Sequence, residues 1–233
     1  MTEEEKLSIL NSAKTFFLEN IIANHERNWK KLTTTSEFDY NPFLINYLAM
    51  LLGGDTSSES LAKALIYPRA LGTSINTTFG TLIQRYITKF FPESFGSTTD
   101  GIDIEFIDRL DGRRKYCQLK AGPQTINDPD VKTITDHFIG LKNLARTNNV
   151  TIATTDMIVG ILYGKKMSGC YKEVDREYPG LMGKDFWEHL TGDSSFYGRI
   201  VKVFADVFIQ VNASEEFANV ISQLASDIES NGL

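Results

Sequence analysis

Cysteine, histidine and long apolar runs are all scarce in this chain of 233 residues, and each scarcity excludes a class of protein. Only Cys117 and Cys170 occur, so a disulfide framework is not expected and a reducing, cytoplasmic location fits better. The two cysteines and three scattered histidines have no zinc-ligand spacing. The apolar run "YLAMLL" is far shorter than the ~20 residues of a membrane span, so no membrane contact is expected.

Basic residues are also in the minority. The chain has 24 Lys and Arg against 30 Asp and Glu, which gives a formal net charge of −6. This balance argues against a protein coated in nucleic acid, although it allows a local basic cleft, and metal-binding carboxylates add to the negative total. The acidic start "MTEEEK" lacks the basic-then-apolar order of a secretion signal.

The hydrophobic periodicity changes after residue 92 from helical spacing to alternation with period two. Residues 1–92 carry helical spacing, whereas "GIDIEFID" and "RKYCQLK" alternate with period two around a "DG" hairpin signal. Helix, buried strand and helix patterns follow, in "VKTITDHFIGLKNLART", "VTIATTDMIVGILYGKK", "GKDFWEHLTGD" and "SEEFANVISQLASDIES". We therefore predict an α/β (α+β) fold with a central mixed β-sheet flanked by helices. It forms a single domain over 1–233, with a helical N-terminal portion over 1–92 and a core over 93–233.

The hairpin of residues 101–120 carries polar side chains on one face. A two-residue turn at 111–112 places Asp103 across from Lys120 and Glu105 across from Gln118. Because side chains alternate along a strand, these four share a face. The residues expected to point the other way are Ile102, Ile104, Phe106 and Leu119.

Two interpretations of this polar face remain open. An ordinary cross-strand ion pair between Asp103 and Lys120 on a solvated surface needs no function. A site is favoured by the abrupt "AGP" after Lys120, by the short polar loops "STTDG" and "QTIND", and by helices that cover the sheet. Oxygens of Asp103 and Gln118 suit a hard divalent cation such as Mg²⁺. Lys120 beside them is suited to hold and polarise an attacking water.

Asp103 followed by Gln118-Leu119-Lys120 resembles the D…(E/Q)xK signature of the restriction-endonuclease-like nucleases, the PD-(D/E)xK superfamily. "QLKAGPQTIN" and the later "GKDFWEHLTGD" are similar to type II restriction endonucleases of the TdeIII-like kind. The resemblance implies a restriction-endonuclease-like fold and a Mg²⁺-dependent type II restriction endonuclease, which hydrolyses phosphodiester bonds of double-stranded DNA at a specific site. It also implies a homodimer, each subunit cutting one strand.

The resemblance implies particular roles. Asp103, Gln118 and Lys120 would be catalytic, and Asp103, Gln118 and the Leu119 carbonyl would bind the metal. The sequence departs from the signature, because Gln118 stands where Glu is more common. Our hypothesis is that Glu105, opposite Gln118 in the expected pairing, supplies part of the missing charge as a further metal ligand. Asp100 is a rival for the first ligand.

DNA contacts are expected from polar residues that follow the catalytic strand and the later buried strand. The candidates are Gln124, Thr125, Asn127, Lys165 and Lys166. The basic run at 113–115 is expected at the hairpin tip, where solvation explains it without DNA. His25, His137 and His189 are isolated on predicted helices and are interpreted as surface or core residues. Two alternative functions stay open: a repair or Mrr-like nuclease of the same fold, and a catalytically inactive DNA-binding module.

Overall fold

A computed structural model describes residues 1–210 and 213–233, without the side chains at positions 73, 74, 76, 77 and 208–210. The described chain divides into two compact units. The sheet unit combines Met1–Lys14 with Gly80–Ala205, and the helical unit combines Thr15–Phe79 with Asp206–Leu233. The expectation of a single domain over residues 1–233 stays a prediction.

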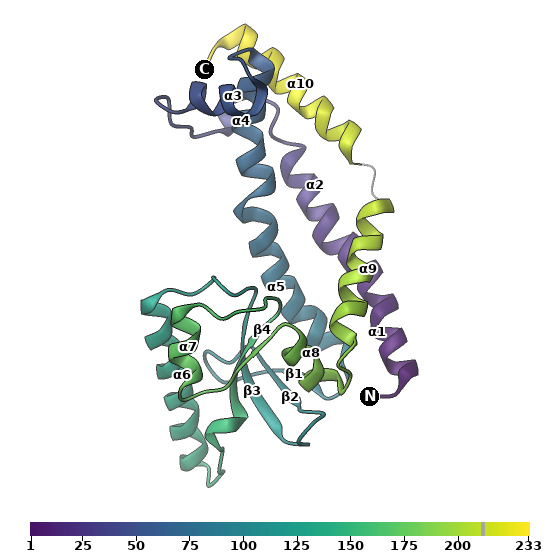
Figure 1. Ribbon diagram of the computed structural model, residues 1–233, viewed down its shortest axis with the longest axis vertical. Helices are drawn as coiled ribbons and strands as arrows, with labels where there is room; N and C mark the ends of the chain where they lie inside the picture. Colours follow the sequence, from purple (N-terminus) through teal and green to yellow (C-terminus); the bar gives the residue numbers. More distant parts are fainter. Residues whose placement is uncertain (211–212) are drawn as a thin grey trace. The chain divides into compact units, whose positions relative to one another are not determined.

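The sheet unit is built on one five-stranded mixed sheet in the order β1-β2-β3-β4-β5 (Figure 1). The strands are β1 (Ser94–Gly96), β2 (Ile104–Ile107), β3 (Arg114–Lys120), β4 (Met157–Ile161) and β5 (Gly180–Met182). β1, β2 and β3 pair antiparallel, whereas β3, β4 and β5 pair parallel. The predicted fold class, a mixed sheet flanked by helices, is confirmed.

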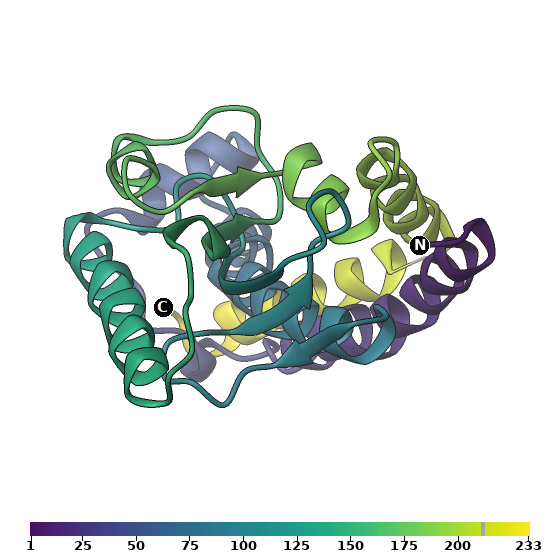
Figure 2. The same ribbon diagram turned by 90° about the horizontal axis from the view of Figure 1, so that it is seen from below.

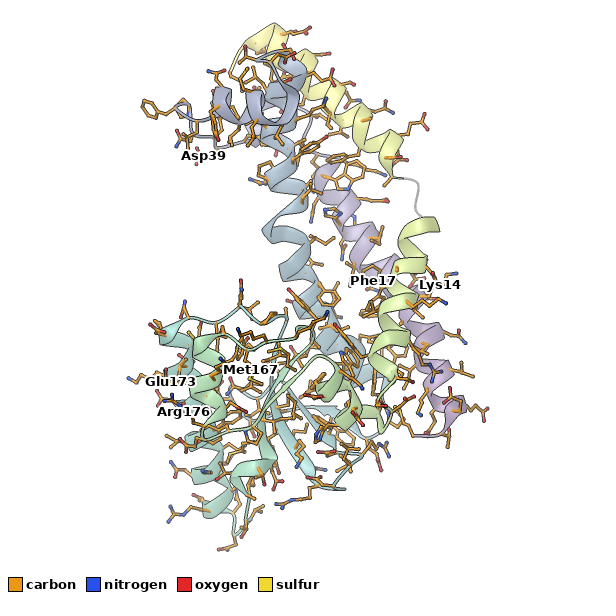
Figure 3. All side chains as sticks on the ribbon, in the orientation of Figure 1. Lys14, Phe17, Asp39, Met167, Glu173 and Arg176 are labelled. Atoms are coloured by element: carbon orange, nitrogen blue, oxygen red, sulfur yellow. The ribbon has the colours of Figure 1, made fainter. Side chains whose placement is uncertain are left out.

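One face of the sheet is covered by α6 (Asp128–Thr147) and α7 (Gly169–Asp175). Ile134 and Phe138 of α6 join Val159 and Ile161 of β4 in one buried cluster. Residues of β4 at positions 157, 159 and 161 lie on this face because side chains alternate along a strand. The opposite side of α7 is solvent-exposed, as the outward side chains of Glu173 and Arg176 show (Figure 3).

The other face is covered by α8 (Lys184–Thr191), so the sheet lies between α6 and α7 on one side and α8 on the other (Figure 2). Gly160 of β4 permits this contact, because a Cβ there would lie 2.6 Å from the Phe186 ring and 2.8 Å from the Cys117 sulfur. Cys117 is fully buried, and burial raises the pKa of its thiol. The residue therefore acts as a small apolar filler, as the alternation pattern predicts.

Three further helices belong only partly to the sheet unit, because the division between the two units falls within each of them. They are α1 (Glu3–Phe16), α5 (Thr73–Phe90) and α9 (Phe196–Gln210). Phe91, just after α5, packs edge-on against Phe196 and obliquely against Trp187. The Tyr86 hydroxyl donates to the carbonyl of Ile9 across 2.5 Å. These aromatic contacts anchor the helices beside the sheet face that α8 covers.

The helical unit has its own apolar core. Its helices are α2 (Ala23–Trp29), α3 (Ile45–Gly53), α4 (Ser58–Leu71) and α10 (Ser214–Asn231), with a π-helical segment over Phe17–Ile22 and a 3₁₀ turn over Thr35–Glu37. Trp29, Ala49, Ile66 and Leu224 are among its buried residues. Pro68 lies inside α4; its fixed φ is compatible with a helix, although proline lacks the N–H donor and its ring crowds the carbonyl four residues earlier.

Some elements differ from the sequence-based expectation. β1 and β5 were not predicted, and the apolar stretch after residue 150 forms the single strand β4 after a 3₁₀ turn at Thr154–Asp156. α7 was also not predicted; it is a short helix capped by Ser168, whose hydroxyl accepts the Tyr171 N–H. Within the described chain, every helix falls short of the length and apolar character that a membrane crossing requires.

Candidate active site

The loop of the central hairpin is wider than predicted. The last paired residues are Ile107 and Arg114, so the loop spans residues 108–113 and is not the two-residue turn expected at 111–112. Two aspartates widen it, because Asp108 accepts the N–H of residue 110 and Asp111 accepts the N–H of residue 113, each at 2.9 Å. Such side-chain capture of a backbone N–H two residues on competes with a tight turn.

The loop is also centred one residue earlier than predicted, at 110–111, which changes the partner of Glu105. Its Cα partner is Tyr116 and not Gln118, so the predicted pairing is wrong. The Glu105 carboxylate accepts hydrogen bonds from Ser97 Oγ at 2.8 Å and from Arg114 Nη1 at 3.3 Å. Metal binding by Glu105 stays a prediction, now without the strand register that motivated it.

Asp103 lies at a β-bulge and not in the predicted direct pairing with Lys120. The Asp103 N–H donates to the Cys117 carbonyl at 3.0 Å, while Ile104 is the Cα partner of the same cysteine. Two residues of one strand therefore oppose one of the other, which defines a bulge and re-aims a side chain. The Asp103 carboxylate turns toward β3, and its Oδ2 accepts the Leu119 N–H at 2.6 Å.

The electrostatics of Asp103 connect it with the end of β3. Partial burial raises the pKa of the Asp103 carboxyl, while the Leu119 N–H and the positive charges of Lys120 and His137 act to lower it. The charge of the Lys120 ammonium thus acts on the carboxylate, and the shared catalytic role of the two residues stays a prediction. A buried carboxylate of this kind is stabilised further by any cation placed beside it.

Two side chains that support Asp103 were missed in the sequence. Gln84 of α5 donates from Nε2 to the Asp103 carbonyl at 2.9 Å. The carbonyl is available for this bond because the Leu119 N–H donates to the Asp103 carboxylate instead. His137 of α6 packs against Gly101. A Cβ added to Gly101 would be 2.1 Å from the His137 ring, and the φ of Gly101 is +72°. Among the described residues, its buried Nδ1 has no hydrogen-bond partner. Neither residue has a sequence spacing that would have identified it.

Gln118 and Lys120 occupy the carboxyl end of β3. Gln118 is 3% exposed, and its Nε2 donates to the Ile134 carbonyl at 3.1 Å. The amide oxygen of Gln118 is therefore the side-chain atom left to bind a metal. Ile102, predicted to point away from Gln118, is instead buried in the α6-side cluster with Ile134, because the bulge shifts the alternation. Lys120 is half-buried, and its carbonyl accepts the Leu162 N–H at 3.0 Å.

This donor set fits Mg²⁺ only as part of a larger shell. Within the described parts of the chain, no three His, Cys, Asp or Glu residues are grouped to hold a metal ion. Mg²⁺ commonly takes one or two protein carboxylates and completes its octahedron with water and substrate phosphate. The Asp103 carboxylate, the Gln118 amide oxygen and the Leu119 carbonyl match that pattern. Asp100, the rival first ligand, is exposed.

The predicted DNA-contacting loops lie at the same edge of the sheet as Lys120. β3 and β4 run parallel and Lys120 pairs with Ile161, so the loops after both strands begin at this edge. They also touch each other, because a Cβ on Gly164 would be 3.2 Å from the Pro123 ring. Lys165 and Lys166 are both exposed here.

The three polar candidates after β3 are all exposed, but two have structural roles as well. The Thr125 hydroxyl donates to the Gly122 carbonyl at 2.9 Å. Asn127 is the N-cap of α6, and its side chain accepts the Asp130 N–H at 3.1 Å. Gln124 precedes both and is exposed. Base reading by these residues stays a prediction.

The basic run at 113–115 is solvated only in part, because Arg113 and Arg114 are exposed as expected whereas Lys115 is buried. Lys115 is only 3% exposed, and its ammonium lies 3.7 Å from Asp108, 2.5 Å from Asp111 and 3.4 Å from Asp156. Arg113 also pairs with Asp156, and Arg114 pairs with Glu105. Acidic side chains from the loop and from the turn before β4 thus neutralise the run. The sequence did not indicate this because Asp156 is distant along the chain.

His189 extends this charge cluster. Its Nδ1 lies 2.7 Å from Asp108 Oδ2, and Asp108 is fully buried. The hydrogen bond and charge of Asp108, helped by Asp111 and opposed by burial and Lys115, raise the pKa of His189 above 6.5. Lys115 and Lys120 are five residues apart on one strand, about 16 Å, so the cluster is separate from the Asp103 site.

Stability is expected to depend on pH through His189. A histidine whose folded-state pKa is raised contributes stability that is complete below its unfolded pKa and is lost as pH rises through its folded pKa. The unfolding free energy of wild type should therefore be higher than that of His189→Gln, and this difference should be larger at about pH 5.5 than at about pH 8.5. Urea unfolding at both pH values measures this difference. A difference that grows toward alkaline pH would contradict the assigned pair.

Comparison with known protein families gives a match for this chain. The family model described as "Type II restriction endonuclease EcoO109I" matches residues 17–212, which is most of the chain and includes the whole central hairpin. The comparison with curated proteins finds no match.

Proposed function

The chain belongs to the family of the type II restriction endonuclease EcoO109I, and we propose that it uses Mg²⁺ to hydrolyse phosphodiester bonds at a short specific site in double-stranded DNA. The observation that carries this proposal is the bulge that turns Asp103 toward the end of β3, within electrostatic reach of Lys120. The D…QxK arrangement of the PD-(D/E)xK nucleases, with its TdeIII-like features, is part of the proposal.

The proposed roles follow from the chemistry of each group. Asp103, the Gln118 amide oxygen and the Leu119 carbonyl would hold Mg²⁺ together with a phosphate oxygen of the DNA. When bound, Mg²⁺ stabilises the negative charge that builds up on the phosphate. Lys120 holds the nucleophilic water, and its positive charge favours loss of the water proton. Gln84 fixes the Asp103 backbone, so the carboxylate keeps its direction.

DNA binding is proposed for the edge of the sheet where β3 and β4 end. Lys165 and Lys166 supply positive charge for phosphates, and Gln124 is the exposed amide beside them. Thr125 and Asn127 are retained as candidates in the same loop. Recognition of a two-fold-symmetric site is proposed for a homodimer, with each subunit cutting one strand.

Digestion of phage DNA with Mg²⁺, followed by sequencing of the ends, tests the function. The expected result is a set of discrete fragments whose ends share one short sequence, with no cleavage in EDTA. Smeared products, or a requirement for modified or damaged DNA, would instead assign a repair or Mrr-like nuclease. DNA binding without cleavage under any divalent cation would assign a catalytically inactive DNA-binding module.

A further inference from the structure

The helix α5 differs in charge from the other long helices of this chain. Its 18 residues include no Asp or Glu, and its two cations are Arg85 and Lys89. Within the described chain, the other helices of 14 or more residues, α1, α4, α6, α9 and α10, each carry at least one carboxylate. The chain as a whole has 30 Asp and Glu. α5 is therefore locally positive although the protein is negative.

One turn of α5 lies against the proposed catalytic site. Gln84 donates to the Asp103 carbonyl at 2.9 Å. Four residues earlier, a Cβ on Gly80 would lie 3.5 Å from the Cβ of Ala121, the residue that follows Lys120. Both contacts lie within the sheet unit. Because residues four apart share one face of a helix, Gly80 and Gln84 form a row that runs beside both strands of the central hairpin.

The neighbouring row of α5 presents exposed polar side chains. Thr81, Arg85 and Lys89 follow one another at intervals of four residues, and all three are exposed. We call these three residues the α5 row. Each stands one position after a residue of the row that includes Gly80 and Gln84, which places it about 100° further around the helix. The α5 row therefore faces solvent next to the row that contacts the site.

The cations of the α5 row are not neutralised by carboxylates. In the part of the chain that the structure describes, neither Arg85 nor Lys89 forms an ion pair with Asp or Glu. The surface lysines Lys30 and Lys63, by contrast, each pair with a glutamate. The Lys89 ammonium lies 5.1 Å from the centre of the Phe90 ring, a contact that adds no negative charge. Like charges four residues apart destabilise a helix, and a bound anion would remove that cost.

The chemistry of the α5 row matches the backbone of DNA. Phosphate contacts in protein–DNA complexes come from Arg and Lys and from hydroxyl and amide groups such as that of Thr81. A guanidinium can bind two phosphate oxygens at once. Arg85 and Lys89 are about 6 Å apart along the helix axis, whereas phosphates of one strand follow each other at about 3.4 Å along the duplex. The two cations therefore suit different phosphates of one strand.

We propose that the α5 row binds the DNA backbone beside the scissile phosphate, with Arg85 as its principal phosphate contact and Lys89 as the second. This inference rests on the proposed function, since that function supplies the DNA. It adds a helix to a DNA-binding surface otherwise proposed for the loops after β3 and β4. Backbone contacts carry no sequence information, so the α5 row sets the affinity and position of the DNA and not the recognition sequence.

Fluorescence anisotropy of a labelled duplex in Ca²⁺, over a series of salt concentrations, tests the inference on the full chain. Arg85→Ala should weaken binding by about 10-fold or more, and Lys89→Ala should act in the same direction. Each lost phosphate contact should make the slope of log K against log salt shallower by about 1. The loss should be equal on two duplexes of unrelated sequence. Arg146→Ala, at an exposed arginine near the end of α6, is the matched control and should bind like wild type.

The outcomes separate this inference from the proposed function. Circular dichroism first establishes that each variant is folded. Wild-type affinity and salt slope in both Arg85→Ala and Lys89→Ala would overturn the inference and leave the proposed function intact. An equal loss in Arg146→Ala would also overturn it, since the effect would then come from total charge. A wild-type chain that binds no DNA at any salt concentration would contradict both. Weaker binding by the two variants of a chain that cleaves no DNA would support the inference and contradict only the proposed chemistry.

Discussion

Replacing Lys120 by Ala is expected to lower the rate of DNA cleavage by about 10³-fold while leaving DNA binding within a few fold of wild type. Positioned proton-transfer and charge-stabilising groups contribute about 10²–10⁴-fold to enzymatic rates. Lys120 stands at the end of β3, within electrostatic reach of Asp103, where the nucleophilic water is proposed to sit. Asp103→Asn keeps the shape of the side chain but removes its charge, and it should reduce cleavage at least as much.

Single-turnover cleavage and binding in Ca²⁺, measured on the same DNA duplex, provide the two readouts. Lys132→Ala is the matched control, since Lys132 is an exposed lysine of α6 and should keep wild-type rates. An effect on binding that equals the effect on rate would mean that Lys120 only holds DNA. A Lys120→Ala rate close to that of wild type would remove Lys120 from the chemistry.

Replacing Lys115 by Ala is expected to cost the sheet unit about 3–5 kcal/mol of unfolding free energy. Lys115 is 3% exposed, and its ammonium is the central cation among Asp108, Asp111 and Asp156. Without it, the fully buried Asp108 keeps only His189 as a charged partner among these contacts. Loss of one member of a buried network leaves its partners desolvated and unpaired, which is the source of the large expected cost.

Urea unfolding monitored by Trp187 fluorescence in a Trp29→Phe background reports on the sheet unit alone. Trp187 lies in that unit, whereas Trp29 lies in the helical unit. Arg114→Ala is the control, since Arg114 forms a largely exposed pair with Glu105 and should cost about 1 kcal/mol or less. Equal midpoints for Lys115→Ala and Arg114→Ala would show that the cluster does not hold the hairpin in place.

The central hairpin shows how far local sequence patterns predict structure. Period-two alternation in "GIDIEFID" and "RKYCQLK" is a local property, and it correctly indicated the strands β2 and β3, although β2 covers only residues 104–107 of the first stretch. The "DG" signal correctly indicated a hairpin but not its loop, because Asp108 and Asp111 capture backbone N–H groups and widen it. β1 and β5 have three residues each, too few for any alternation to be recognised.

The surroundings of the site could not be predicted, because they come from distant segments. Asp103 and Lys120 were identified from one hairpin, but the bulge that aims Asp103 depends on Gln84 from α5 and on the fit of Gly101 against His137. Lys115 was expected to be solvated, since its acidic partner Asp156 is distant in sequence. Sequence patterns report periodicity and turn chemistry, whereas contacts between remote elements are decided by packing.

The most direct measurement of the central claim is the position of a divalent cation in a crystal of this chain with its DNA, using Mn²⁺ located by anomalous scattering. We predict an ion about 2.1 Å from an Asp103 oxygen and from the Leu119 carbonyl, with Lys120 Nζ hydrogen-bonded to the water that faces the scissile phosphorus. An ion bound without Asp103, or a Lys120 ammonium directed away from that water, would contradict the account.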